Sequence, residues 1–441
     1  MQTPIPRDIP LPLPVNPAFA EILLVIAFIA HILFVNLMVG GSILVGVFQW
    51  RGLKTPDYDA LARKLADTVT VNKSMAVVLG VAPLLLLNVL YTIHIYTANA
   101  LTGTAWMMVV PLVTMAFLLT YFHKYTWDTL AAHRKTHIAI NLLAVAIFLF
   151  IPFVFLANVN LMMFPEEWTK IHGFLSAVMQ PNVVPRYMHF MSASLILTSL
   201  FGVGYFGRPA FDGAAHFAEF DEKRLRRIFY SVAFSVSLLQ FVVGPIVLVT
   251  LPGRGMSGPM LTAIGLGATL AIPAVWLMWK ELVSPADRVY TRLGPIVSML
   301  GLTVVCMAFG RQMYRGVALA EHKRAMGEAT AKWVDDAAQA EYESALGTAR
   351  ASRGESLGET HFKATCSGCH AVDKKLVGPS LVEIAEIYAS DPEGIVRWAK
   401  QPGQKREGAR MPSMAIVGDT KLAAIAKYML EAGKQGDSSA P

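Results

Sequence analysis

The sequence is poor in charge and in cysteine, and both shortages narrow what the protein can be. Charged residues make up 16% of the 441 residues, and hydrophobic residues make up 54%. The apolar residues gather in long runs before residue 313, so this part is predicted to lie in a membrane. Of three cysteines, Cys306 stands alone in an apolar run, and no structural disulfide is expected. The net charge is +7. Before residue 313, most positive residues fall in the connections between apolar runs, where they set the orientation of a membrane protein, so no nucleic-acid partner is predicted.

The other two cysteines stand in the motif Cys366-Ser-Gly-Cys369-His370. Two thiols at this spacing can reach the two vinyl groups of one porphyrin, and the adjacent imidazole can then bind the iron. A zinc site would need further ligands, but the sequence has no second cysteine pair. A thioredoxin-like site would need a βαβ context, which is missing. We therefore predict one covalent haem c; the alternative is a redox pair followed by an unrelated histidine.

The region around this motif is expected to form a small helical domain over 356–441 that ends in a disordered tail from Gln435. An electron carrier needs a sixth iron ligand, and Met411, which precedes Pro412, is the preferred candidate because a thioether raises the haem potential. Met414 is the second candidate, and both could instead be packing methionines. Residues 356–433 resemble a class I cytochrome c: a helix leading into the attachment motif, a Gly-Pro step, a Met-Pro loop and a final helix over 419–432.

The chain before this domain is predicted to be an all-α, polytopic membrane bundle over 1–313. Eight apolar runs are long enough to cross a bilayer at about 20 residues each. These runs cover 19–49, 74–97, 104–123, 138–163, 187–206, 228–250, 257–279 and 293–313. Residues 314–355 are rich in Ala, Glu, Lys and Arg, which predicts an exposed helical linker between the bundle and the small domain.

Two arguments predict the same orientation in the bacterial inner membrane. Covalent haem c is made on the outer, oxidising side, and an even number of spans then places both termini in the periplasm. Independently, sixteen Lys and Arg residues fall in the connections predicted inside, against four outside, namely Arg7, Lys170, Arg186 and Arg254. No cleavable signal peptide is expected, because the first apolar run is too long for one.

Ionisable residues inside a membrane point to function. His189 near the outer end of the fifth run could bind a haem b iron, with Met260 on the seventh run as its partner. Arg186 and Arg311 could neutralise the haem propionates. The alternative for His189 is a hydrogen bond to a carbonyl group, since a polar group in lipid needs some partner.

Two further histidines are candidates for the same kind of role. His31 lies about halfway along the first run. His94 lies near the outer end of the second, where an ordinary interfacial histidine is also common. The remaining intramembrane or inner-side histidines are predicted to be solvated: His123, His133, His137 and His216.

Residues 19–313 resemble subunit I of cytochrome bd oxidase. The resemblance is carried by Ala-His31-Ile-Leu-Phe-Val in the first run, by Arg186-Tyr-Met-His189 in the fifth and by Gly-Arg311-Gln in the eighth. It implies that His189 binds a low-spin haem b, and that His31 matches the axial histidine of the oxygen-binding haem. The type of that haem (b, d or o) stays open.

The chain also departs from that family. Ala308 stands where the family has a glutamate ligand, and the acidic residue expected in the second or third helix is missing, with Asn88 at a plausible equivalent place. Met313 and Tyr314 replace the Pro-Trp that follows Gly-Arg-Gln, and the long quinol-oxidising loop shrinks to about 251–256.

These losses, with the gained haem c, predict a respiratory cytochrome that passes electrons between a bundle haem b and the tethered haem c. Its partners would be other c-type cytochromes, with a homodimer or a sister subunit by analogy. Two alternatives stay open. One is a cytochrome c-fed terminal reductase of oxygen or another small molecule at a haem on His31. The other is a membrane anchor for haem c without haem b.

Overall fold

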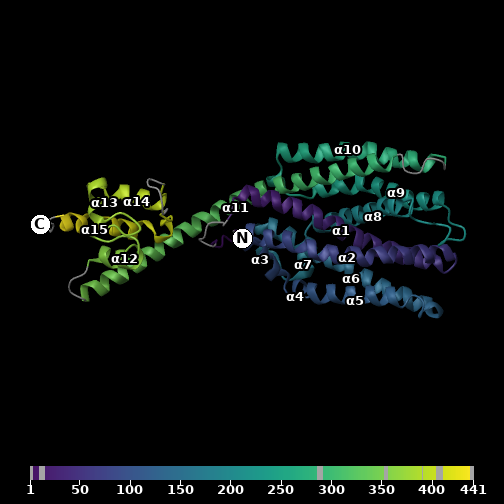
Figure 1. Ribbon diagram of the computed structural model, residues 1–441, viewed down its shortest axis with the longest axis horizontal. Helices are drawn as coiled ribbons and strands as arrows, with labels where there is room; N and C mark the ends of the chain where they lie inside the picture. The colour runs from purple at the N-terminus through teal and green to yellow at the C-terminus, as the bar shows by residue number, and fades with distance from the viewer. Residues whose placement is uncertain are drawn as a thin grey trace. The chain divides into compact units, whose positions relative to one another are not determined.

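The computed structural model describes residues 3–8, 15–285, 292–351, 356–389, 391–403 and 411–437. These residues form helices and connections without any strand. The chain divides into two compact units (Figure 1). The bundle unit comprises Met1–Pro4 and Leu13–His322, and the C-terminal unit comprises Ile5–Pro12 and Lys323–Pro441. The division therefore lies at His322, inside the segment that was expected to be a linker.

Eight helical segments of the described chain are long and apolar enough to cross a membrane. They contain the long helices α1 (Pro17–Gly52), α2 (Pro56–Leu90), α5 (Val109–Tyr125), α6 (Arg134–Met163), α8 (Val183–Phe206), α9 (Glu222–Val249), α10 (Gly258–Val283) and α11 (Leu293–Ala351). Shorter elements connect them: α3 (Thr92–Thr102), α4 (Thr104–Met107), η1 (Ala131–His133), η2 (Pro165–Lys170), α7 (Phe174–Val178) and η3 (Gly253–Gly255). Each predicted span coincides with one of the eight, so the predicted class, a helical membrane bundle followed by a small helical domain, is confirmed. The second predicted run is divided, because α2 ends at Leu90.

Local signals explain where these helices begin. The Asn16 side chain caps α1 by accepting a hydrogen bond from the Ala18 amide at 2.9 Å, and Pro17 occupies the first helical position. Asp221 caps α9 and Ser257 caps α10 in the same way. α9 ends at Val249 and α10 begins at Gly258, so the connection between them is as short as the sequence indicates.

Small residues let the central helices approach one another. α1 packs along α2 and α8, and α8 packs along α9. A Cβ atom at Gly40 of α1 would lie 2.5 Å from the Thr198 hydroxyl of α8, and one at Gly202 of α8 would lie 2.5 Å from the Phe229 ring of α9. Glycine at such crossings is typical of membrane helices, whose association depends on close packing.

The bundle has a core at each end, named here by the termini of α1. The Pro17 end packs Leu24, Tyr91, Met163, Met260 and Tyr314 together. The Gly52 end packs residues that include Phe48, Phe229 and Met278. The elements α3 and η2 and the starts of α8 and α10 lie at the Pro17 end. The candidate ligands and arginines on these elements therefore belong to that end.

Two histidines at the Gly52 end are not solvated, contrary to the sequence prediction. His123 is 2% exposed and His137 is 3% exposed. Their rings stack with centroids 4.0 Å apart, and Gln49 bridges them. Gln49 accepts from the His123 Nε2 at 3.0 Å and donates to the His137 Nδ1 at 2.6 Å. The two rings therefore join α1, α5 and α6 through paired polar atoms. His133 and His216 are exposed, as predicted.

The C-terminal unit consists of the second half of α11 and the small helices α12 (Leu357–Thr365), α13 (Leu381–Tyr388), α14 (Pro392–Lys400), η4 (Ala415–Val417) and α15 (Asp419–Asp437). Phe362, Leu381, Ile395 and Met429 are among the residues of its core. α15 extends through Gln435 to Asp437, so the predicted disordered tail is wrong for 435–437, and 438–441 lie outside the described residues.

The predicted exposed linker is also corrected. Tyr314, Ala318 and Leu319 are buried in the bundle unit, and Met326 and Ala338 are buried in the C-terminal unit. α11 therefore continues without a break through residues 314–351 of the predicted linker. Residues 352–355 of the predicted linker and Arg288 of the predicted inner connections lie outside the described residues.

Candidate functional site

The attachment motif forms a tight turn directly after α12. Ser356 caps this helix by accepting from the Glu359 amide at 3.3 Å. The Cys369 and His370 amides donate to the Cys366 carbonyl at 3.1 and 3.0 Å, which gathers both cysteines and the histidine at one point. Burial, with the neighbouring Cys369, raises the pKa of the Cys366 thiol to about 11. A reactive redox cysteine needs a lowered pKa, so this environment disfavours the redox-pair alternative.

The ring of His370 is held in the orientation that iron binding needs. Its Nδ1 donates to the Pro379 carbonyl at 2.8 Å, which leaves the Nε2 lone pair available. Gly378 lies against the ring, and a Cβ atom there would come within 2.8 Å of Nδ1 and Nε2. A side chain at this position would displace the imidazole. The two thiols, the oriented imidazole and this glycine fit a covalently attached haem.

The segment with the candidate sixth ligand is fixed at its C-terminal side. Met411 is half-buried, and the two residues that follow Pro412 bind the end of α14. The Ser413 hydroxyl donates to the Lys400 carbonyl at 2.6 Å, and the Met414 amide donates to the Ala399 carbonyl at 2.8 Å. Met414 uses its backbone for this contact, so both methionine side chains remain available as ligands, and the preference for Met411 stays a prediction.

Positive charge gathers at the Pro17 end of the bundle. Arg186 of α8 and Arg311 and Arg315 of α11 interact electrostatically with one another. Each has a buried side-chain nitrogen without a hydrogen-bond partner, and none forms an ion pair among the residues that the structure describes. Arg315 is 5% exposed, donates to Gln312 at 2.9 Å and lies 5.1 Å above the Tyr91 ring. Three uncompensated guanidinium groups in an apolar bundle call for an anion.

Arg315 was missed by the sequence reasoning. Its signal was present: it lies four residues after Arg311, which places both on one face of α11. The prediction of an exposed linker from residue 314 hid that signal.

His189, the predicted haem b ligand, lies one helical turn from Arg186 on α8. Its Nδ1 is buried without a hydrogen-bond partner in the described chain, and its carbonyl accepts from Gln240 of α9 at 3.0 Å. The ring is therefore not the carbonyl-bonded histidine of the alternative interpretation. Met260 is 1% exposed and packs with Tyr314 in the core of the Pro17 end. Its pairing with His189 stays a prediction.

His31 lies against α2. Its Nδ1 donates to the Ala76 carbonyl at 2.8 Å, so its Nε2 carries a free lone pair. Gly80 faces the ring, and a Cβ atom there would lie 2.8 Å from its Cε1. A hydrogen bond of this kind orients metal-binding histidines. The environment of His31 therefore fits an axial ligand.

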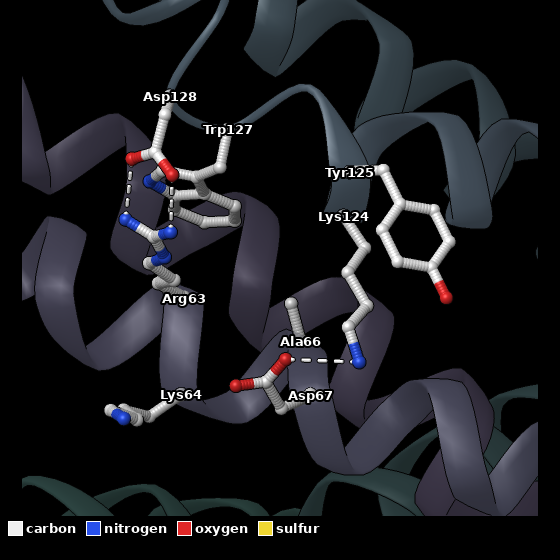
Figure 2. A pocket seen from close by; sticks show the side chains of 8 residues that line it. All are labelled: Arg63, Lys64, Ala66, Asp67, Lys124, Tyr125, Trp127 and Asp128. Carbon is white, nitrogen blue, oxygen red and sulfur yellow. Dashed lines mark hydrogen bonds and ion pairs between the residues drawn. The ribbon is translucent and has the colours of Figure 1, made fainter.

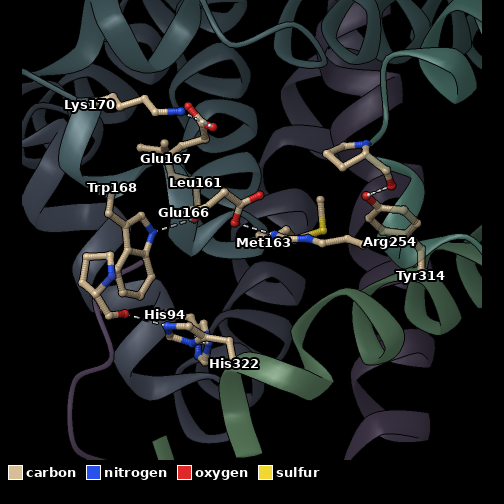
Figure 3. Close-up of polar contacts among 12 residues, drawn as sticks. His94, Leu161, Met163, Glu166, Glu167, Trp168, Lys170, Arg254, Tyr314 and His322 are labelled. Carbon is tan, nitrogen blue, oxygen red and sulfur yellow. Dashed lines mark hydrogen bonds and ion pairs between the residues drawn. The ribbon is translucent and has the colours of Figure 1, made fainter. Parts of the chain in front are cut away.

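His94 has a different environment from the other candidates. Its Nε2 donates to the Nδ1 of His322 at 3.1 Å, and the Nε2 of His322 donates to the Pro4 carbonyl at 2.9 Å (Figure 3). Trp168 packs edge-on against both rings. Because the two rings hydrogen-bond to each other, no haem is needed to explain why His94 and His322 are buried. His322 was also missed, because it too lies in the predicted linker.

The connections at this end are tied together by further polar contacts. Arg254 donates to the Glu166 carboxylate at 2.6 Å and to the Met163 carbonyl at 3.1 Å (Figure 3). The Tyr314 hydroxyl donates to the Pro252 carbonyl at 3.0 Å. These bonds hold η2 and η3 over the core that contains Met260.

A cavity of about 440 Å³ opens at the Gly52 end, between α2 and the end of α5 (Figure 2). Two of its three cations are paired: Arg63 binds both oxygens of Asp128 at 2.7 and 2.6 Å, and Lys124 binds Asp67 at 3.1 Å. None of the predicted ligands lines it. This cavity is separate from the candidate haem sites.

Comparison with known proteins identifies the C-terminal domain. Residues 356–433 match the family model of cytochrome c. Over 41 residues the chain is 49% identical to cytochrome c-551 of Pseudomonas denitrificans, a match that covers 9% of this chain and 50% of that protein. The chain thus spans half the length of this curated relative. The resemblance of 19–313 to cytochrome bd oxidase stays a prediction. Residues 356–433 are a cytochrome c domain, which implies covalent haem c and haem-based electron transfer, and this domain follows a bundle of candidate membrane-spanning helices.

Proposed function

We propose that the protein transfers electrons between a haem b in the bundle unit and the haem c of its C-terminal domain. The observation that carries the proposal is the cluster of Arg186, Arg311 and Arg315, which has no carboxylate partner among the residues that the structure describes. A haem b carries two propionate groups, so it would supply the negative charge that the three arginines lack. The ring of His189, one turn from Arg186, is not committed to another contact, because its buried Nδ1 has no hydrogen-bond partner among the described residues.

The residues of the chain would divide the work as follows. His189 would hold the iron of haem b, and the arginines would hold its propionates. Cys366, Cys369 and His370 would hold haem c, whose sixth ligand would come from Met411 or Met414. Bound haems accept and donate single electrons. Because both sites lie on one polypeptide, transfer between them would need no encounter between separate proteins.

The test is the haem content of the purified full-length protein. Pyridine haemochrome analysis should give both haem b and haem c, and His189→Ala should lose a low-spin haem b while haem c is retained. His133→Ala is the matched control, because His133 is exposed. Finding haem c alone in the parent protein would overturn the proposal and leave a membrane anchor for haem c.

A second candidate function is supported by His31. The hydrogen bond from its Nδ1 to Ala76 prepares its Nε2 for a second bundle haem. A haem with an open sixth position there would make the protein a cytochrome c-fed reductase of oxygen or another small molecule. Carbon monoxide should then bind the reduced bundle haem and fail to bind in His31→Ala. A reduced protein that does not respond to carbon monoxide would exclude this function.

We also propose a bacterial inner-membrane location with the cytochrome c domain in the periplasm. The requirement for haem c attachment on the outer side supports it, as does the excess of Lys and Arg in the connections at the Gly52 end. Protease added to intact spheroplasts should remove the C-terminal domain. Other c-type cytochromes are the proposed redox partners, and a second copy or a sister subunit is the proposed membrane partner.

A further inference from the structure

The second half of α11 has one buried face although it lies beyond the bundle. Met326 is 1% exposed, Thr330 is 8% exposed and Ala338 is 5% exposed. With half-buried Val334, these residues recur at every fourth position, which places them on one side of the helix. The side chains that cover this face belong to the same unit.

Two segments cover the buried face in succession. The N-terminal segment covers its first part: the Asp8 amide donates to the Thr330 hydroxyl at 2.7 Å, and Arg7 lies 4.6 Å above the Trp333 ring. The cytochrome c domain covers its second part, through Gly418 against Ala338 and an ion pair between Lys421 and Glu341. The domain therefore packs back onto the helix from which it is suspended.

Gly418 leaves no room for a side chain where it faces α11. Its φ is +86°, a conformation that favours glycine, and a Cβ atom there would lie 2.6 Å from the Ala338 Cβ. No side chain could be added on either partner without separating α11 from the domain. The contact lies at the turn between η4 and α15. This turn is the C-terminal end of residues 411–418, named here the methionine segment because they contain both candidate sixth ligands.

The methionine segment is thus held from two sides. α14 binds it through Ser413 and Met414, and Lys400 of α14 forms a 2.5 Å ion pair with Asp419 beside Gly418. α11 supports it from the side of Gly418. A methionine sulfur remains on a haem iron only while its loop is fixed, because the thioether is a weak neutral ligand that water or an added ligand can replace.

We propose that Ala338 of α11 is a positioning residue for the sixth ligand of haem c, so that docking of the domain on α11 sets the haem c potential. This inference rests on a methionine ligand from residues 411 or 414, and not on haem b. α11 then supports the haem pocket as well as connecting the two units.

The test uses the full chain with Ala338→Leu, which keeps helix propensity but cannot fit against Gly418. Ala337→Leu is the matched control, since Ala337 is the exposed neighbour. We expect Ala338→Leu to retain covalent haem c, to lower its midpoint potential, to lose the sulfur-to-iron charge-transfer band and to let reduced haem c bind carbon monoxide. The control should behave as the parent.

Further variants separate the possible failures. Gly418→Ala should reproduce the signature from the other side of the contact, and Glu341→Gln, which removes only the ion pair, should give a smaller shift. Identical potentials in Ala338→Leu and Ala337→Leu would overturn the proposal. If neither Met411→Ala nor Met414→Ala changes the band, the methionine ligand itself is wrong and the proposal falls with it. Haem b content is unaffected in all these outcomes, so the proposed function is judged separately.

Discussion

The two candidate haem sites are assembled in different ways. In the cytochrome c domain the motif Cys366–His370 brings three functional side chains together within one turn, through hydrogen bonds to the Cys366 carbonyl. In the bundle unit the candidates come from α1, α8, α10 and α11, and only helix packing brings Arg186 near Arg311 and Arg315. The first site is a property of a short peptide, whereas the second exists only in the folded bundle.

This difference predicts how each site responds to substitution. A covalent site should fail completely when its thiols are removed, because no other contact replaces the bonds. A site held by packing and charge should weaken by degrees, because each side chain supplies a part of the binding energy. It should also show a compensating effect, since removing a cation relieves repulsion in the empty bundle.

The largest expected effect is that of replacing both attachment cysteines. Cys366→Ser combined with Cys369→Ser should abolish covalent haem, as measured by haem staining of denatured protein. Cys306→Ser should leave it unchanged, because Cys306 lies in α11, outside the domain. If haem b remains in the double variant, the two sites assemble independently. Covalent haem that persists would contradict the assignment of the motif.

Removal of one arginine should have an intermediate effect on the bundle haem. A hydrogen bond to a charged group is worth about 1.5–3 kcal/mol, so Arg311→Gln should weaken haem b binding about 10- to 150-fold. Titration of haem into haem-free protein measures this change. Arg254→Gln is the control, because Arg254 is paired with Glu166 and is partly exposed.

The same variant tests the sign of the charge argument. Without haem, Arg311→Gln should make the bundle more stable to heat, since two like charges remain instead of three. A haem-free bundle that Arg311→Gln destabilises would show that Arg311 has a partner other than an anionic cofactor.

A smaller effect is expected from Gly378→Ala. The added Cβ would press on the His370 ring, and overpacking of this kind costs about 1–3 kcal/mol. Haem c should still attach, while its midpoint potential shifts and the domain unfolds at lower denaturant concentration. Gly368→Ala is the control, because no atom lies within 4 Å of a Cβ at that position. Equal unfolding midpoints for the two variants would contradict the role of Gly378.

The difference between a site within one short peptide and a site assembled by helix packing also decides how much could be predicted from the sequence. The attachment motif and the eight apolar runs are contiguous, so their spacing and length were sufficient. The spacing of Arg311 and Arg315 was visible in the sequence, but the contacts of Arg315 and His322 depend on how far α11 continues as part of the bundle, which composition did not indicate. Composition after residue 313 indicated solvent exposure, but distant parts of the chain cover α11. The bundle buries Tyr314, Ala318 and Leu319, and the N-terminal segment and the cytochrome c domain cover the face that follows.

The smallest expected effect concerns acid stability of the cytochrome c domain. His361 is 6% exposed, its Nε2 has no partner among the described residues, and burial lowers its pKa below the usual 6.5. The unfolded chain therefore binds a proton more readily than the folded domain at mildly acidic pH. The stability associated with neutral His361 is present above pH 6.5 and is lost as the pH falls toward the lowered pKa.

His361→Phe should remove this part of the pH dependence, because a phenyl ring fills the site and does not titrate. Denaturant unfolding, followed by haem c absorbance at several pH values between about 7.5 and 5, should give a flatter profile in the variant than in the parent. His172→Phe provides the comparison, since His172 lies in the connection after η2, outside the domain. Parallel profiles for parent and His361→Phe would mean that bound haem or solvent already satisfies the imidazole, and the acid sensitivity of the domain would then arise from its carboxylates.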